Sequence, residues 1–174
     1  MKCPNCGKEM RSKVRDYEYV ESGLKNVVLK NITVYECAKC GEILPEIANV
    51  KQVHRWIAEY LLRKQSLLTG EEFKFLRKSM TKSAKELAPV LGVHPVTISR
   101  WENNKETIGP QSDRLIRVVF AAGPGELLLE SARKRLIQVL NTFPAIMLSK
   151  RKPKPERIIL PPPQSLQRAS LAGE

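Results

Sequence analysis

Four cysteines, grouped into two short repeats, constrain this chain more than any other feature of its sequence. The repeats are Cys3-Pro4-Asn5-Cys6-Gly7 and Cys37-Ala38-Lys39-Cys40-Gly41. A two-residue spacer lets two thiolates in one tight turn reach the same ion, and four thiolates complete the tetrahedral set that Zn²⁺ prefers. The glycine after each pair can adopt the backbone conformation that turns the chain away from the metal. We therefore expect one structural Zn²⁺ per chain, bound by Cys3, Cys6, Cys37 and Cys40.

Other chemistries of paired cysteines fit this pattern less well. Disulfides are rare in the cytosol, and a thioredoxin-like redox site needs one pair in a βαβ context rather than two matched pairs. A catalytic zinc ion needs an open position for water, which four thiolates do not leave. The two histidines, His54 and His94, have no nucleophile next to them in sequence, so no catalytic triad is indicated. We expect a protein that is not an enzyme.

The segment between the repeats predicts a small antiparallel sheet. Residues 13–19 and 27–35 are rich in Val, Ile, Thr and Tyr, which is typical of strands. Turns are predicted at Ser22-Gly23 and at Lys30-Asn31. Residues 1–46 should therefore form a zinc-binding β-hairpin module with four cysteine ligands, which zinc stabilises because the module contains few apolar residues.

Helical periodicity follows this module. Apolar residues at spacings of three and four predict a linker helix within residues 47–68: Ile47, Val50, Val53, Ile57 and Leu61. Two capping boxes then predict the starts of short helices, and they pair Thr69 with Glu72 and Ser83 with Glu86. Gly92 suits the end of the second short helix, and Pro95 suits the start of a third, with His94 as its N-cap. The inner faces should carry Phe73, Leu76, Met80, Leu87, Val90, Leu91, Ile98 and Trp101.

The short helices contain a further pattern. It consists of Ser83-Ala84-Lys85-Glu86-Leu87-Ala88, Leu91-Gly92-Val93 and Ile98-Ser99-Arg100-Trp101-Glu102-Asn103. These residues resemble the helix-turn-helix of the Cro and phage-repressor (XRE) family. Joined to the N-terminal four-cysteine module, the whole resembles the MqsA-type antitoxin family, whose zinc module is also called a YgiT-type zinc finger. The resemblance implies a mainly α fold, in which a five-helix-type helix-turn-helix domain over residues 69–143 follows the small β zinc module and the linker helix.

The same resemblance implies a function. It suggests a sequence-specific transcriptional regulator that is the antitoxin and autorepressor of a type II toxin–antitoxin system, with a cognate toxin bound through the zinc module. The third helix of the helix-turn-helix would lie in the DNA major groove, and a homodimer would read a palindromic operator. Two alternatives stay open, a standalone regulator without a toxin and a zinc-containing protein-interaction adaptor.

The resemblance implies eight candidate residues for DNA contacts. Arg100 is the first choice for reading bases, because its guanidinium can bond O6 and N7 of guanine together. Thr97 and Val96 are placed to pack on a thymine methyl group. Four candidates for phosphate contacts are His94, Ser83, Lys82 and Lys85. Asn104 completes the outward face of the third helix.

Two of the resembling positions depart from the family pattern. Ala84 stands where many relatives have a phosphate-bonding Gln, and Val96 stands where the antitoxins have a base-reading Asn. The resemblance therefore does not imply an operator sequence. It does imply an ion pair between Arg77 and Glu102. Pro89, inside the second helix, removes one backbone hydrogen bond and has no functional account.

The C-terminal third predicts two more helices and a tail. Residues 110–122 should form a helix with Leu115, Val118 and Val119 inward, and residues 126–141 another helix that belongs to the core or to a dimer face. Residues 144–174 are basic and rich in proline, which predicts a disordered tail. Such a tail either binds DNA phosphates without sequence preference or keeps the protein soluble.

Charge and hydropathy are compatible with this interpretation. The chain has 30 Lys and Arg against 18 Asp and Glu, a formal net charge of +12, which favours polyanionic partners such as double-stranded DNA. No apolar run is long enough for a membrane helix, and the N-terminus has no apolar leader segment. We therefore expect a cytoplasmic protein without a membrane partner.

Overall fold

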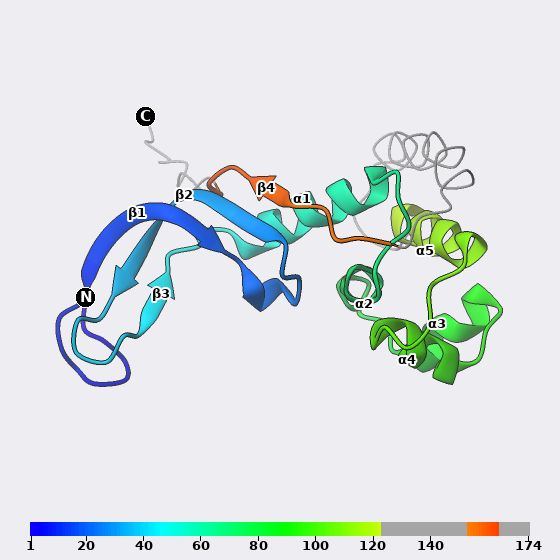
Figure 1. Ribbon diagram of the computed structural model, residues 1–174, viewed down its shortest axis with the longest axis horizontal. Helices are drawn as coiled ribbons and strands as arrows, with labels where there is room; N and C mark the ends of the chain where they lie inside the picture. Colours follow the sequence, from blue (N-terminus) through cyan, green and yellow to red (C-terminus); the bar gives the residue numbers. More distant parts are fainter. Residues whose placement is uncertain (123–152, 164–174) are drawn as a thin grey trace, which may run out of the picture. The chain divides into compact units, whose positions relative to one another are not determined.

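The computed structural model describes residues 1–122 and 153–163 of the 174-residue chain. Its elements form two compact units (Figure 1). The sheet unit comprises Met1–Val20, Lys25–Trp56 and residues 157–163, and the helical unit comprises Glu21–Leu24 and the described part of Ile57–Glu156. Helix α1 (Val50–Arg63), predicted as a separate linker, is shared by both units, because the division falls after Trp56. The predicted class, mainly helical with a small sheet, is confirmed.

Strand β2 (Val27–Glu36) is the centre of the sheet unit. Strand β1 (Arg11–Glu18) pairs antiparallel along one edge of β2. The other edge is divided, because β3 (Ile43–Pro45) pairs antiparallel with the end of β2 and β4 (Ile158–Leu160) pairs parallel with its beginning. Strand β1 exposes almost all its residues, whereas β2 buries Val27, Val28, Leu29, Ile32 and Val34.

The turn predicted at Lys30-Asn31 is wrong, because β2 continues through these residues as a β-bulge. The pairing shifts between Arg15 and Tyr17, so that Asp16 faces both Lys30 and Asn31. The Asp16 carboxylate accepts hydrogen bonds from the Lys30 ammonium and the Asn31 backbone N–H. Asn31 has φ 51°, a left-handed conformation that Asn tolerates better than most residues. The chain reverses instead at residues 19–26, which include the predicted Ser22-Gly23.

In its described residues, the helical unit contains the end of α1 and four further helices. These are α2 (Gly70–Ser79), α3 (Ala84–Leu91), α4 (Pro95–Glu102) and α5 (Pro110–Ala122). Both predicted capping boxes are present, at Thr69 and at Ser83. Gly92 ends α3 with φ 65°, and Nδ1 of His94 accepts the Val96 N–H at 3.2 Å, so the predicted caps of α3 and α4 are confirmed.

The core of the helical unit differs from the predicted one at several positions. Phe73, Leu76, Leu87 and Ile98 are buried as expected, but Met80 is only half-buried, Val90 is 46% exposed and Leu115 is 38% exposed. On α5 the inward positions belong to Asp113, Ile116, Arg117 and Ala121. The apolar periodicity predicted the wrong inward face at Leu115, because charged residues usually face solvent. On α5, however, Asp113 and Arg117 are buried.

Buried charges hold the connection between α1 and α2. Lys64 Nζ lies 2.7 Å from Glu72 Oε2, and Arg117 Nε lies 2.9 Å from Asp113 Oδ2; all four side chains are at most 1% exposed. The Arg117 guanidinium also donates to the backbone carbonyls of Lys64 and Ser66, and Asp113 Oδ1 accepts the Leu68 N–H. The connection is thus attached to α2 and α5 by polar contacts that leave little room for solvent.

The C-terminal prediction is corrected where the structure describes it. Residues 153–163 were expected in a disordered tail, but they include β4, whose Ile158 and Leu160 are buried. The proline-rich composition predicted disorder. The segment nevertheless contains a short apolar run, Ile-Ile-Leu, which pairs with β2. The helix predicted at 126–141 and the rest of the expected tail lie outside the described residues. Among the residues described, no helix is long and apolar enough to cross a membrane.

Candidate metal centre and nucleic-acid surface

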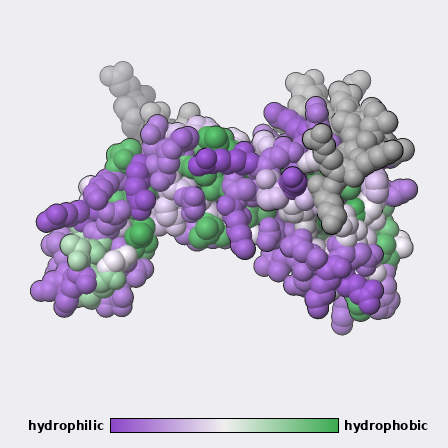
Figure 2. All heavy atoms as spheres, viewed as in Figure 1, coloured by the Kyte–Doolittle hydropathy of each residue, from purple (hydrophilic) through white to green (hydrophobic). Residues whose placement is uncertain are grey.

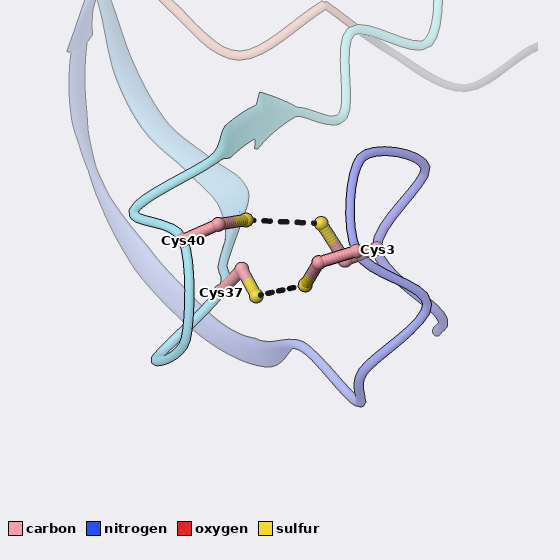
Figure 3. Close-up of side chains that lie close together, drawn as sticks. Cys3, Cys37 and Cys40 are labelled. Atoms are coloured by element: carbon pink, nitrogen blue, oxygen red, sulfur yellow. Dashed lines mark hydrogen bonds between the residues drawn. The ribbon is translucent and has the colours of Figure 1, made fainter.

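The four cysteines converge as the sequence pattern predicted. The first repeat precedes β1 and the second follows β2, and the antiparallel register sets Arg11 opposite Glu36, so both repeats lie at the same end of the sheet. Their sulfur atoms all lie within 4.8 Å of one another. The Sγ atoms of Cys3 and Cys40 are 3.5 Å apart, and those of Cys6 and Cys37 are 3.4 Å apart. Figure 3 shows Cys3, Cys37 and Cys40 turned toward a common centre.

The two repeats have the same backbone geometry. The Gly7 N–H donates to the Cys3 carbonyl and the Gly41 N–H to the Cys37 carbonyl, each at 2.9 Å. Gly7 has φ 71° and Gly41 has φ 74°, which is the left-handed region where glycine is favoured. Cys3 and Cys37 are buried and Cys40 is exposed, so the sulfur cluster lies at the edge of the unit with one side open to solvent.

The thiols differ in how readily they ionise. Backbone N–H groups of Cys40 and Lys39 point at the Cys37 sulfur and lower the pKa of that thiol to about 6. At Cys6 the Lys8 N–H favours the thiolate, but the hydrogen bond with the Cys37 thiol and burial outweigh it and raise the pKa to about 12. Adjacent thiolates repel one another, so four of them need a cation between them. The donor set and its spacing fit a metal ion with four sulfur ligands.

The predicted DNA-contacting residues all lie in the helical unit. Arg100, Val96 and His94 are exposed along α4, and Thr97 is half-buried beside them. Ser83 and Lys85 are exposed at the start of α3, where Lys82 is half-buried. The opposite side of α4 carries the buried Ile98 and Trp101. Figure 2 shows a mostly hydrophilic surface over α3 and α4, with separate hydrophobic side chains in it.

Some of these side chains already have contacts within the chain. Ser83 Oγ accepts the Glu86 N–H at 3.2 Å, and His94 caps α4 through Nδ1. Asn104 follows the end of α4 with φ 55°, and its Oδ1 accepts the Gly70 N–H at 3.3 Å. Asn104 therefore connects the start of α2 to the end of α4, and its role in DNA binding stays a prediction. Asn104 was predicted on the outward face of the third helix but lies beyond its last residue, Glu102, and no local pattern indicated its contact with Gly70.

Arg77 and Glu102 form the ion pair that the resemblance implied. Arg77 Nε lies 2.6 Å from Glu102 Oε1, and Nη2 donates to Oε2 at 2.9 Å. The side chains are 12% and 8% exposed. The third nitrogen of the guanidinium, Arg77 Nη1, donates to the Lys82 carbonyl at 2.7 Å. One guanidinium thus fixes the end of α4 and the turn before α3 to α2, which holds the outward residues of both helices in place.

Sequence reasoning missed the buried pairs Lys64–Glu72 and Asp113–Arg117. Asp113 and Arg117 are four residues apart on one helix, which is a usable signal for an ion pair but not for its burial. Lys64 gives no such signal, because its partners Glu72 and the Lys154 carbonyl lie eight and ninety residues away in the sequence.

Comparisons with known proteins match about the first three quarters of the sequence. The sequence model of a family described as the antitoxin component of a bacterial toxin–antitoxin system, MqsA, matches residues 1–133. A curated protein named antitoxin MqsA, from Escherichia coli (strain K12), is 29% identical over 124 residues, which cover 68% of this chain and 92% of the relative. No solved structure matches the chain. Both cysteine repeats and α1–α5 fall within the matched residues, whereas residues 153–163 lie beyond the family match.

Proposed function

Because the chain belongs to the MqsA antitoxin family, we propose that it is the antitoxin of a type II toxin–antitoxin system and represses its own operon by binding DNA. The observation that carries the DNA-binding part is the outward face of α4, where Arg100 and Val96 are exposed on a helix that is capped at His94 and packed through Ile98 and Trp101. A helix held in this way can enter a major groove without rearranging its own unit.

The proposed readout assigns different tasks to different residues. Arg100 reads a guanine, Val96 and Thr97 pack on base edges, and His94, Ser83, Lys82 and Lys85 contact phosphates. Ser83 and Glu86 cap α3 and fix the start of this helix, whose positive dipole end favours phosphates nearby. A homodimer would present two copies of α4 to a palindromic operator, roughly 34 Å apart.

The cysteine cluster is proposed to hold one Zn²⁺ with a structural role. Cys3, Cys6, Cys37 and Cys40 would supply all four ligands, and the ion would stabilise the turns that they define. Four sulfur ligands leave no position for substrate, which fits a regulator rather than an enzyme. The zinc-bearing sheet unit is the proposed site for a cognate toxin, and the cytoplasm is the proposed location.

The DNA-binding proposal is tested with the DNA upstream of the chain's own coding sequence. Arg100→Ala should weaken binding to this DNA by about 1–3 kcal/mol and relax the preference at one base position, while binding to scrambled DNA changes little. The matched control is Lys78→Ala, which removes an exposed charge on α2 outside the proposed surface. Both affinities are measured by fluorescence anisotropy at one fixed salt concentration. If the unaltered protein binds operator and scrambled DNA equally well, the repressor proposal is wrong.

The toxin partner is tested separately. The product of the neighbouring reading frame is co-expressed with the chain, and a complex that survives size-exclusion chromatography is the expected result. If specific DNA binding persists but no such complex forms, the chain is a standalone regulator. If neither is found, the adaptor alternative replaces both.

A further inference from the structure

The strap, which we define as residues 153–163, lies beyond the residues matched by the family and yet packs into both units. Residues 153–156 belong to the helical unit and residues 157–163 to the sheet unit. The strap is coloured orange in Figure 1, where β4 lies beside β2. Neither the cysteine cluster nor the α4 surface uses these residues.

In the helical unit the strap completes the surroundings of a buried ammonium group. Lys64 Nζ donates to Glu72 Oε2 at 2.7 Å, to the Leu67 carbonyl at 3.3 Å and to the Lys154 carbonyl at 2.8 Å. The Lys64 side chain has no exposure to solvent. An ammonium group offers three donors, so the Lys154 carbonyl supplies one of the three acceptors that Lys64 needs. If the strap leaves, this donor is satisfied only if water enters.

A second contact in the same unit involves a strap side chain. The Glu156 carboxylate accepts hydrogen bonds from the Tyr60 hydroxyl at 3.0 Å and from the Ser66 hydroxyl at 2.8 Å. Tyr60 lies on α1, and Ser66 lies in the connection between α1 and α2 that also includes Leu67. The strap therefore contacts residues on both sides of Lys64 in the sequence, Tyr60 before it and Ser66 after it.

In the sheet unit the strap is bound by main-chain pairing and by two apolar side chains. Ile158, Ile159 and Leu160 align with Val27, Val28 and Leu29, and the Ile158 N–H donates to the Asn26 carbonyl at 2.7 Å. Ile158 is fully buried and Leu160 is 7% exposed, whereas Ile159 between them is 55% exposed. This alternation is the mark of a strand with one buried face.

We propose that the strap couples the two units, so that release of β4 from β2 also withdraws Lys154 and Glu156 from their partners in the helical unit, and the reverse. The two sets of contacts are contiguous, because Glu156 and Arg157 share a peptide bond and consecutive Cα atoms are about 3.8 Å apart. Displacement of one set therefore pulls on the residues that form the other. The strap thereby links the separation of β4 from β2 to the exposure of residues 64–72 to solvent. This coupling is independent of whether the chain binds DNA or a toxin.

The proposal is tested by amide hydrogen exchange on the zinc-loaded full chain. Ile158→Asp should free β4 and accelerate exchange at Val27–Leu29 and at residues 67–72, each by at least about tenfold. The matched control is Ile159→Asp, which places the same charge on the exposed side of the strand and should change neither region. Faster exchange at Val27–Leu29 with unchanged exchange at residues 67–72 would overturn the proposal.

The reverse experiment tests whether the effects of Ile158→Asp come only from unfolding of the sheet unit. Glu156→Ala removes the acceptor of Tyr60 and Ser66 in the helical unit, and coupling requires that exchange at Val27–Leu29 accelerates as well. Lys154→Ala is the control, because Lys154 contributes its backbone carbonyl and not its exposed side chain. An effect of Glu156→Ala confined to the helical unit would also overturn the coupling.

Discussion

The cysteine end of the sheet unit and the interior of the helical unit both bring ionisable groups together, but they compensate the charges differently. Around the cysteines the core is small: Cys3, Met10 and Cys37 are buried, with Cys6, Tyr35 and Leu44 packed against them. In the helical unit, fully buried Phe73, Leu76 and Ile98 accompany the paired charges of Lys64 and Glu72. Four thiolates in the first region would need an external cation, whereas the second region carries its own counter-charges. The two should therefore respond oppositely to metal removal and to loss of a single charged side chain.

The largest expected effect comes from removing one sulfur ligand. Cys37→Ser should abolish metal binding and unfold the cysteine end of the sheet unit, because structural zinc contributes about 10–16 kcal/mol in comparable small sites. The helical content should remain, since the core of the helical unit contains none of the ligands. Metal content and far-ultraviolet circular dichroism measure the two parts. Lys39→Ala, an exposed non-ligand in the same repeat, is the control, and loss of helicity in Cys37→Ser would contradict the contrast between the units.

The next effect comes from the buried ion pair. Lys64→Met should lower the free energy of unfolding by about 3–5 kcal/mol, because Glu72 is left buried without its counter-charge. Replacing both residues, Lys64→Met with Glu72→Leu, should recover much of that loss. The comparison is Lys13→Met in the sheet unit, where the Lys13–Glu36 pair is 62% and 31% exposed and should contribute at most about 1 kcal/mol. Urea denaturation measures all variants, and equal costs for the two single substitutions would contradict the assignment.

A smaller effect tests the close approach between α2 and α4. A Cβ atom at Gly70 would lie 2.0 Å from the Trp101 carbonyl oxygen and 2.8 Å from Asn104 Oδ1. Gly70→Ala should therefore cost about 1–3 kcal/mol of stability through forced displacement of α4. At Gly109 the nearest such atom is 3.8 Å away, so Gly109→Ala should be almost neutral. Thermal denaturation compares them, and a neutral Gly70→Ala would show that the helices are not held at this spacing.

The smallest effect concerns the cap of α3. The Ser83 hydroxyl and backbone N–H donate to the Glu86 carboxylate and hold its pKa below the usual range. A carboxyl group with a lowered pKa in the folded state adds stability above its unfolded pKa of about 4.3, and this stability is lost as the pH falls through the folded pKa. Glu86→Gln should therefore reduce the loss of stability on acidification below about pH 5, measured by denaturation at several pH values. Glu106→Gln, at an exposed position after α4, is the control, and identical acid profiles for Glu86→Gln and the unaltered chain would exclude this role.

Local patterns predicted a large part of the fold and of the candidate site. The capping boxes at Thr69 and Ser83, the C-cap at Gly92 and the cap at His94 each depend on residues within a few positions of one another, and each was correct. The cysteine spacing likewise predicted the turn within each repeat, whereas the pairing of β1 with β2 brings the two repeats together. The failures have a common cause. Asn31 lies in a bulge rather than a turn because a second strand pairs across it, and Leu115 is exposed because buried Arg117 has partners far along the chain.

The sequence by itself determined the turn within each cysteine repeat and the starts of α2, α3 and α4, because those features depend on short spacings and on hydrogen bonds to neighbouring backbone. Only the tertiary structure placed Lys64 beside Glu72, Asn104 beside Gly70 and β4 beside β2. Periodicity reports which side chains are apolar, but a charged side chain can be buried wherever distant residues supply enough partners. A basic, proline-rich segment can likewise form a strand when an edge of a sheet is open to accept it.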